Sequence, residues 1–226
     1  MTTYNLTSNK HGKPYKGLPM EGMIAKWYAK NTGRAPVQKI IFNKVKDVLP
    51  KNAAVLEVAP GPGFLAIEFA KAGNKVTALE ISKTFVEIAA TNAKEANVSV
   101  DVRQGNASDM PFTENSFDFI ICVAAFKNFS EPLQAIREMY RVLKPNGKAC
   151  IMDLRRDVSF DAINKHINND LNITGLNAWF TKIVFKTTLL KNAYTKSEIE
   201  QMVSQTSFTK LRIDEGTLDM DIWLEK

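Results

Sequence analysis

Short apolar runs alternate with amphipathic segments along most of the chain from residue 53 onward. Five runs have the length and the Val, Ile, Leu and Phe content of buried strands, at 53–58, 75–80, 98–103, 117–123 and 148–154. Helical spacing of apolar positions occupies the intervening stretches 64–72, 83–96 and 131–143. This alternation is typical of α/β proteins that are built on a parallel sheet. We therefore expect five parallel strands with crossover helices.

Local signals predict where several of these elements begin and end. Ser82 and Ser130 stand where the N-caps of two helices are expected. Pro145-Asn146-Gly147 predicts a turn between the helix 131–143 and the next strand. Thr195 followed by Glu198 is the pattern of a capping box and predicts the start of another helix.

The end of the chain predicts two further strands, at 207–214 and 217–224, joined as a hairpin. The fold class expected is α/β, doubly wound around a mostly parallel seven-stranded sheet with a terminal β-hairpin. We expect a single domain, 1–226. Its four parts are an N-terminal helical extension, a core, a helical insertion and a C-terminal helix with the hairpin, at 1–50, 53–154, 155–194 and 195–226.

Composition narrows the class of protein. The chain has 226 residues, of which 45% are hydrophobic and 24% charged, as in an average globular protein. Its longest apolar run, 119–126, is far too short to cross a bilayer, so we expect no membrane insertion. The polar start of the chain predicts no export signal. Cys122 and Cys150 are then expected to be reduced core thiols in a cytoplasmic protein.

The formal charge of +6 raises the question of an anionic partner. Lysines are spread along the chain, and no segment combines dense basic residues with aromatic ones, so we expect solvated helix faces and no nucleic-acid binding. His11 and His166 have no neighbours at metal-ligand spacing, and no metal site is expected.

The sharpest local feature is a glycine-containing turn at 59–63 that joins an apolar strand to a helix. Gly61 and Gly63 let a ligand approach the backbone, and the helix N-terminus offers free N–H groups. The next strand ends in Glu80, whose carboxylate can accept hydrogen bonds from both hydroxyls of a ribose. The pattern predicts a nucleoside cofactor, and Gly61-x-Gly63-x-x-Ala66 leaves a dinucleotide open. Glu57, an acid inside the first strand, argues against it.

Five motifs in series resemble the class I S-adenosylmethionine-dependent methyltransferases, in particular the UbiE-like, or methyltransferase type 11, group. The motifs are Val55-Leu-Glu-Val-Ala-Pro-Gly-Pro-Gly63, Leu79-Glu-Ile-Ser82, Gly105-Asn-Ala-Ser-Asp-Met-Pro-Phe112, Ser116-Phe-Asp-Phe-Ile-Ile121 and Arg137-Glu-Met-Tyr-Arg-Val-Leu-Lys-Pro-Asn-Gly147. The resemblance covers about 53–154 and implies a Rossmann-like methyltransferase fold with S-adenosylmethionine as the cofactor and S-adenosylhomocysteine as its product.

The resemblance also implies which residues bind the cofactor. The turn after the first strand, with Glu57, would face the methionine portion, Glu80 and Ile81 the ribose and adenine face, and Asn106 and Ala107 the adenine edge. Ala124 would line the sulfonium end, and Tyr28 is similar to a tyrosine that closes over the cofactor. The expected cofactor-binding residues are thus Tyr28, Glu57, Ala59, Gly61, Gly63, Glu80, Ile81, Asn106, Ala107 and Ala124.

Three departures from the family pattern concern this set. Ala59 stands where the first glycine is usual, Pro60 and Pro62 remove two N–H donors from the turn, and Asn106 replaces the commoner aspartate. Asn106 keeps an acceptor for the adenine amino group and loses the charge. None of the three removes the physical basis for binding.

Residues for the acceptor are expected at the carboxyl ends of the fourth and fifth strands, where ligands bind in such folds. The candidates are Lys127, Asn128, Asp153, Arg155 and Arg156. The two arginines would hold an anionic group, or simply form a solvated or capping charge cluster. No catalytic base is identified, since methyl transfer depends mainly on positioning and on the electrostatics of a dry pocket.

The sequence therefore predicts in-line methyl transfer to a small-molecule acceptor. The segment 155–194 would cover the acceptor pocket with Trp179, Phe180 and Phe185, or these aromatics would only pack a helix on the sheet. Three alternatives stay open. They are a cofactor-binding protein or an enzyme that uses S-adenosylmethionine without methylation, an NAD-dependent dehydrogenase, and an RNA methyltransferase.

Overall fold

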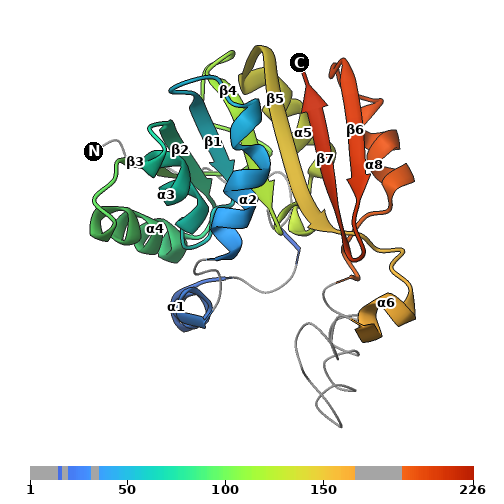
Figure 1. Ribbon diagram of the computed structural model, residues 1–226, viewed down its shortest axis with the longest axis horizontal. Coiled ribbons are helices and arrows are strands. Elements are labelled where there is room, and N and C mark those ends of the chain that lie inside the picture. The colour runs from blue at the N-terminus through green and yellow to red at the C-terminus, as the bar shows by residue number, and fades with distance from the viewer. Residues whose placement is uncertain (1–14, 17–19, 32–35, 166–189) are drawn as a thin grey trace.

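A single seven-stranded sheet organises the molecule. The computed structural model describes residues 15–16, 20–31, 36–165 and 190–226, and the strands run side by side in the order β3-β2-β1-β4-β5-β7-β6 (Figure 1). Strands β1 to β5 are parallel, and β7 is antiparallel to both of its neighbours. The strands are β1 Ala54–Val58, β2 Lys75–Glu80, β3 Val100–Gln104, β4 Phe117–Val123, β5 Leu143–Leu154, β6 Lys210–Glu215 and β7 Asp219–Glu225.

Helices cover both faces of the sheet. One apolar core joins α5 and α8 to one face, and a second joins α2 and α3 to the other. The largest fully buried side chains include Phe69 of α3 and Phe119 of β4, whose rings lie 6.4 Å apart. The described helices are α1 Gly22–Asn31, α2 Val37–Val45, α3 Phe64–Lys71, α4 Lys83–Glu95, α5 Pro132–Val142, α6 Phe160–Lys165 and α8 Lys196–Val203, with 3₁₀ turns η1 Lys46–Val48 and η2 Phe126–Asn128.

The fold class predicted from the sequence is confirmed, including the terminal hairpin. Strong local signals were reliable at helix starts. Ser82 accepts a hydrogen bond from the backbone N–H of Phe85, and Thr195 and Glu198 form a complete capping box. Where sequence periodicity and capping chemistry agree, the backbone therefore begins its helix at the expected residue.

Two predicted boundaries are wrong. Ser130 is not a cap, because Glu131 is the N-cap of α5 and Pro132 opens the helix. The predicted turn at Pro145-Asn146-Gly147 lies inside β5, which begins at Leu143. Leu143 pairs with Phe117 of β4, and the next pair is Lys148 with Phe119. The register therefore shifts between these pairs, and β5 has a bulge there that includes Asn146 at a φ of 63°.

The order of the strands determines where a ligand can bind. From β1 the chain first proceeds outward to β2 and β3, and then returns to the other side of β1 with β4 and β5. In open α/β sheets a crevice forms at the carboxyl ends of the two strands where this reversal occurs. Here these strands are β1 and β4, which places the glycine turn and Ala124 at the same edge of the sheet.

Candidate functional site

The turn after β1 is held in an unusual backbone conformation. Ala59, Gly61 and Gly63 all have positive φ, at 56°, 54° and 76°. Such angles are strained for alanine and cost glycine nothing, which gives the family's usual glycine at position 59 a physical reason. Gly63 is the N-cap of α3 and provides no side-chain cap. The turn therefore places the N-terminus of α3 at this edge of the sheet, where its positive end can face a ligand.

The two glycines of the turn face different surroundings. A Cβ atom on Gly63 would lie 2.8 Å from Cβ of Ala89, whereas a Cβ atom on Gly61 would meet nothing within 4 Å. Gly63 is therefore required for the close packing of the turn against α4. Gly61 borders open space, as expected for the backbone that a cofactor approaches.

This difference predicts distinct effects of two matched substitutions. Both Gly61→Ala and Gly63→Ala place alanine at positive φ, which costs roughly 1–2 kcal/mol. We expect Gly63→Ala to lower the free energy of unfolding by about 1 kcal/mol more, because its methyl group collides with α4. Urea unfolding of the two variants checks this. An equal loss of unfolding free energy in the two variants would mean that the turn of Gly63→Ala moves away from Ala89 and avoids the collision.

Glu80 ties the turn to the end of β2. Its Oε2 accepts a hydrogen bond from the N–H of Gly61 at 3.0 Å, and its Oε1 accepts one from the N–H of Ser82 at 2.9 Å. The side chain is buried, and burial raises its pKa despite these hydrogen bonds. The N–H of Ile81 also contacts the carboxylate, whose two oxygens can accept about four hydrogen bonds in all. The carboxylate is thus oriented in advance for a further donor, such as a hydroxyl of a ribose.

Glu57 is a buried acid with one oxygen unused. Its carboxyl accepts a hydrogen bond from the N–H of Ala66 in the first turn of α3, while Oε2 has no partner among the described residues. Burial, assisted by the nearby charge of Glu80, raises the pKa of Glu57 to about 8. A buried, unpaired oxygen at the crevice fits a cationic ligand group, such as the ammonium of the methionine portion of S-adenosylmethionine.

The raised pKa predicts how Glu57 affects stability. Below pH 4.5 the group is protonated in both the folded and the unfolded chain. As the pH rises from about 4.5 to 8, only the unfolded chain loses the proton, so the folded state loses stability. Relative to the Glu57→Gln variant, we expect wild type to lose about 1 kcal/mol between pH 6 and pH 7. Urea unfolding at the two values measures this, and a pH-independent difference would contradict it.

The adenine side is formed by the ends of β2 and β3. Ile81 is partly exposed, and its carbonyl accepts a hydrogen bond from Nε2 of Gln104 at 3.2 Å. The side-chain oxygen of Asn106, which the sequence assigned to the adenine amino group, accepts a hydrogen bond from the N–H of Ser108 at 3.0 Å. One lone pair of that oxygen is left, and Ala107 is buried beside it. Asn106 therefore shapes its own loop in addition to any contact with adenine.

Tyr28, which is predicted to close over the cofactor, and Tyr15 both pack against the core from the N-terminal segment. Tyr28 of α1 packs edge-on against Phe85 of α4, with ring centroids 5.9 Å apart. Tyr15, which the sequence analysis missed, pairs through its backbone with Phe129 beyond β4. Its buried hydroxyl makes no hydrogen bond of good geometry with the described residues. Burial raises the pKa of this hydroxyl, and the charges of Glu21 and Glu80 add to the effect, against a backbone contact with Met20 that lowers it. Tyr15 thus links the N-terminal segment to the region after β4, and no periodic pattern around it could have indicated this.

A buried ion pair closes the end of the crevice at β4 and β5. Nζ of Lys127 lies 2.7 Å from Oδ1 of Asp153 and donates a second hydrogen bond to the carbonyl of Ala124 at 2.7 Å. The other oxygen of Asp153 accepts a hydrogen bond from the N–H of Lys127 at 2.8 Å. Ala124 itself is held at a φ of 55°. The pair therefore fixes the backbone at the position predicted for the reacting methyl group.

The other acceptor candidates are used differently. Arg155 forms ion pairs with Asp157 and Glu215 at 2.8 and 2.6 Å, and Arg156 is paired with Glu198. Of the two interpretations left open for these arginines, the structure favours a charge cluster that ties β5 to the hairpin and α8. Asn128, another acceptor candidate, uses its backbone carbonyl to accept a hydrogen bond from the N–H of Lys16 at 2.6 Å.

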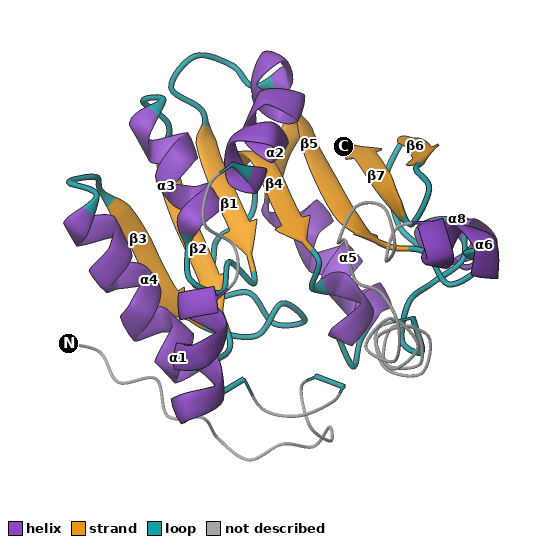
Figure 2. Cartoon of the chain, turned by 60° about the horizontal axis from the view of Figure 1, so that its bottom comes forward, coloured by secondary structure: helices purple, strands orange, loops and turns teal. Residues whose placement is uncertain are grey.

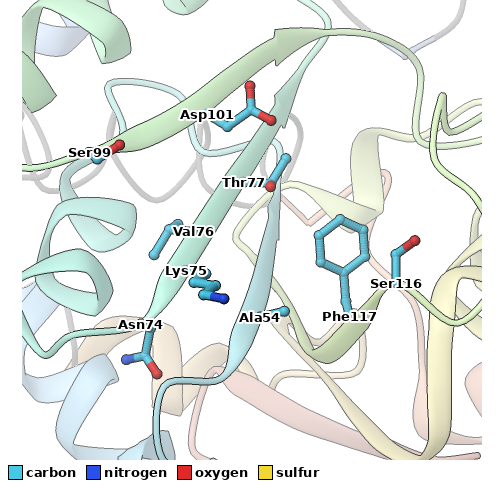
Figure 3. Close-up of a pocket in the computed structure, with 9 residues that line it drawn as sticks. All are labelled: Ala54, Asn74, Lys75, Val76, Thr77, Ser99, Asp101, Ser116 and Phe117. Atoms are coloured by element: carbon cyan, nitrogen blue, oxygen red, sulfur yellow. The ribbon is translucent and has the colours of Figure 1, made fainter.

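A pocket of ≈ 460 Å³ lies elsewhere, at the amino ends of the strands (Figure 3). Ala54, Lys75 and Phe117, the first residues of β1, β2 and β4, line it. It contains neither the glycine turn nor any predicted site residue. His11, His166, Trp179, Phe180 and Phe185 lie outside the described residues, as does most of the segment 155–194 that was expected to cover the acceptor.

Comparison with known proteins bears on the choice between the cofactors that the glycine pattern left open. Residues 56–151 match the methyltransferase domain family, the type 11 group. The matched segment lies within the part of the chain where the five motifs resemble class I methyltransferases. A match to a methyltransferase domain favours S-adenosylmethionine over NAD as the cofactor.

Individual relatives agree with this assignment. An uncharacterised methyltransferase of Bacillus subtilis is 34% identical over 117 residues, which are 50% of this chain and 46% of that protein. A demethylmenaquinone methyltransferase of Listeria welshimeri is 37% identical over 107 residues, 45% of either chain. This chain thus matches about half the length of these relatives. The structure of an S-adenosylmethionine-dependent methyltransferase from Aquifex aeolicus has the same fold, with a TM-score of 0.65 and 19% identity. The match covers 89% of this chain and 97% of that protein.

Proposed function

We propose that the protein transfers the methyl group of S-adenosylmethionine to a small-molecule acceptor by in-line displacement. One observation carries the proposal. Glu80, at the end of β2, is held by the N–H groups of Gly61 and Ser82 with acceptor capacity to spare, beside the unpaired oxygen of Glu57. These two acids match, in position and chemistry, the ribose and the cationic end of S-adenosylmethionine.

The residues around the crevice have separable tasks in this reaction. Glu80 would hold the ribose, Glu57 would face the methionine ammonium, and the ion pair of Lys127 with Asp153 would keep Ala124 in place beside the reacting centre. Tyr15, paired with Phe129 after β4, would help to exclude water from the bound cofactor. The cofactor, once bound, supplies a methyl group on a sulfonium, and S-adenosylhomocysteine leaves as the neutral thioether. The chain therefore contributes position and a dry environment.

The acceptor class we propose is an apolar aromatic small molecule, such as a reduced quinone. Support comes from the Listeria relative, which is named for demethylmenaquinone. The ion pairs of Arg155 and Arg156 argue against an anionic acceptor bound by these side chains.

The test is transfer of tritiated methyl from S-adenosylmethionine to a panel of acceptors. The panel contains a demethylated naphthoquinol, a catechol, an aliphatic amine and bulk RNA. We expect labelled product and S-adenosylhomocysteine with the naphthoquinol. Labelled RNA instead would favour the RNA methyltransferase. Cofactor binding with no product from any acceptor would favour a protein that binds S-adenosylmethionine without methylating.

A further inference from the structure

Helix α1 carries its large apolar side chains on the outside. Ala25 and Ala29, one turn apart, are buried against α4, with Ala25 fully so. On the opposite side of the helix, Met23 is 87% and Trp27 65% exposed, and Ile24 beside them is 50% exposed. An amphipathic helix of a globular domain normally shows the reverse arrangement. The small residues of α1 face the protein, and its methionine and tryptophan face away from it.

The beginning of α2 also has apolar side chains exposed on its surface. Val37 and Ile40 are 52% and 63% exposed. We refer to Met23, Ile24, Trp27, Val37 and Ile40 collectively as the α1–α2 surface. Scattered apolar residues on a surface need no explanation, but a concentration that includes tryptophan on two consecutive helices indicates a contact with another body.

The charged residues of α1 and α2 themselves are all basic. Between Glu21 and Asp47 the sequence contains no acidic residue, and its basic residues are Lys26, Lys30, Arg34, Lys39, Lys44 and Lys46. Lys26, Lys30 and Lys39 are exposed on α1 and α2, while Lys44 is paired with Asp221. Exposed lysines beside tryptophan and aliphatic side chains are the composition of helices that lie in the interface of an anionic bilayer.

The position of α1 places this surface next to the cofactor crevice. The carbonyl of Met20, just before α1, accepts a hydrogen bond from Oγ of Ser82 at 2.6 Å, and Glu21 caps α4 through the N–H groups of Lys83 and Thr84. Ser82 follows directly after Ile81, so α1 is fixed at the carboxyl edge of the sheet (Figure 2). A body seated on α1 would therefore lie beside the mouth of the crevice.

We propose that the α1–α2 surface docks on an anionic lipid bilayer, with Met23, Ile24 and Trp27 in the interfacial layer and the lysines against lipid phosphates. Charge complementarity and the outward tryptophan carry this choice of occupant. The contact is peripheral, and among the described helices none is long and apolar enough to cross a membrane. The inference does not depend on which acceptor, if any, is methylated.

The test is co-sedimentation of the full chain with vesicles of phosphatidylcholine alone and of phosphatidylcholine mixed with phosphatidylglycerol. We expect binding to the mixed vesicles only, weakened by added salt. Met23→Ser/Trp27→Ser and Lys26→Glu/Lys30→Glu should each reduce the partition coefficient on the order of tenfold or more. Circular dichroism verifies that each variant is folded, and Trp27→Phe in place of Trp27→Ser should keep most of the binding.

Two control variants test whether the effect is local. Val48→Ser changes an exposed apolar residue on η1, and Lys51→Glu/Lys75→Glu reverses two exposed charges at the amino edge of the sheet. Both should bind vesicles as wild type does. Absence of binding to the mixed vesicles, or an equal loss in the Lys51→Glu/Lys75→Glu control, would overturn the proposal. So would a dimer in sedimentation velocity that Met23→Ser/Trp27→Ser dissociates, because the occupant would then be a second copy.

Discussion

Replacing Glu80 by alanine is expected to weaken the binding of S-adenosylhomocysteine on the order of a hundredfold or more. The carboxylate would hold a ribose hydroxyl, and a hydrogen bond to a charged group contributes about 1.5–3 kcal/mol. The same side chain holds the turn at Gly61, so its loss also loosens the backbone that the cofactor approaches. Isothermal titration calorimetry measures the affinity directly.

Two further variants separate binding from folding in this prediction. Glu80→Gln keeps one acceptor oxygen and should show an intermediate loss of affinity. Glu87→Ala, on the exposed side of α4, should bind as wild type does. Thermal unfolding shows whether each variant is folded at the temperature of the titration. A folded Glu80→Ala protein with an affinity within about twofold of wild type would mean that the ribose is bound elsewhere.

Replacing Lys127 by methionine is expected to lower the free energy of unfolding by about 3–5 kcal/mol. Asp153 is almost completely buried, and removing its partner leaves a carboxylate without compensation in the interior. The matched control is Lys144→Met, because the ion pair of Lys144 with Asp118 is partly exposed and should contribute no more than about 1 kcal/mol. Urea unfolding of both variants gives the comparison.

A double variant distinguishes charge from packing. In Lys127→Met/Asp153→Asn the buried charge is gone, while the amide can still accept a hydrogen bond from a backbone N–H. We expect it to be more stable than Lys127→Met alone. If the double variant is less stable than the single one, the cost of Lys127→Met comes from lost packing and not from an unpaired charge.

Much of the fold could be predicted because strong local signals agree with one another. The strand that contains Val55, the cap at Ser82 and the box of Thr195 with Glu198 each combine hydrophobic periodicity with end chemistry. The order of the last strands in the sheet could not be predicted in this way. No local pattern indicates that β7 inserts between β5 and β6, because that pairing depends on contacts between distant segments.

The site shows the same division. Gly61 and Glu80 could be proposed as site residues because a glycine turn and an acid at the end of the next strand are local features, and a hydrogen bond joins them in the structure. Tyr15 could not be proposed, since its position depends on a backbone pairing with the distant Phe129. Lys127 and Asp153 were both candidates, yet only the parallel pairing of β4 with β5 makes them a buried ion pair.

The measurement that tests the account most directly is parallel calorimetric titration of the wild-type protein with S-adenosylmethionine, S-adenosylhomocysteine and NADH. The account predicts one site for each of the two sulfur nucleosides and no heat of binding from NADH. Binding of NADH alone, or binding of the sulfur nucleosides that persists unchanged in Glu80→Ala, would contradict the assignment of the crevice between β1 and β4 as the cofactor site.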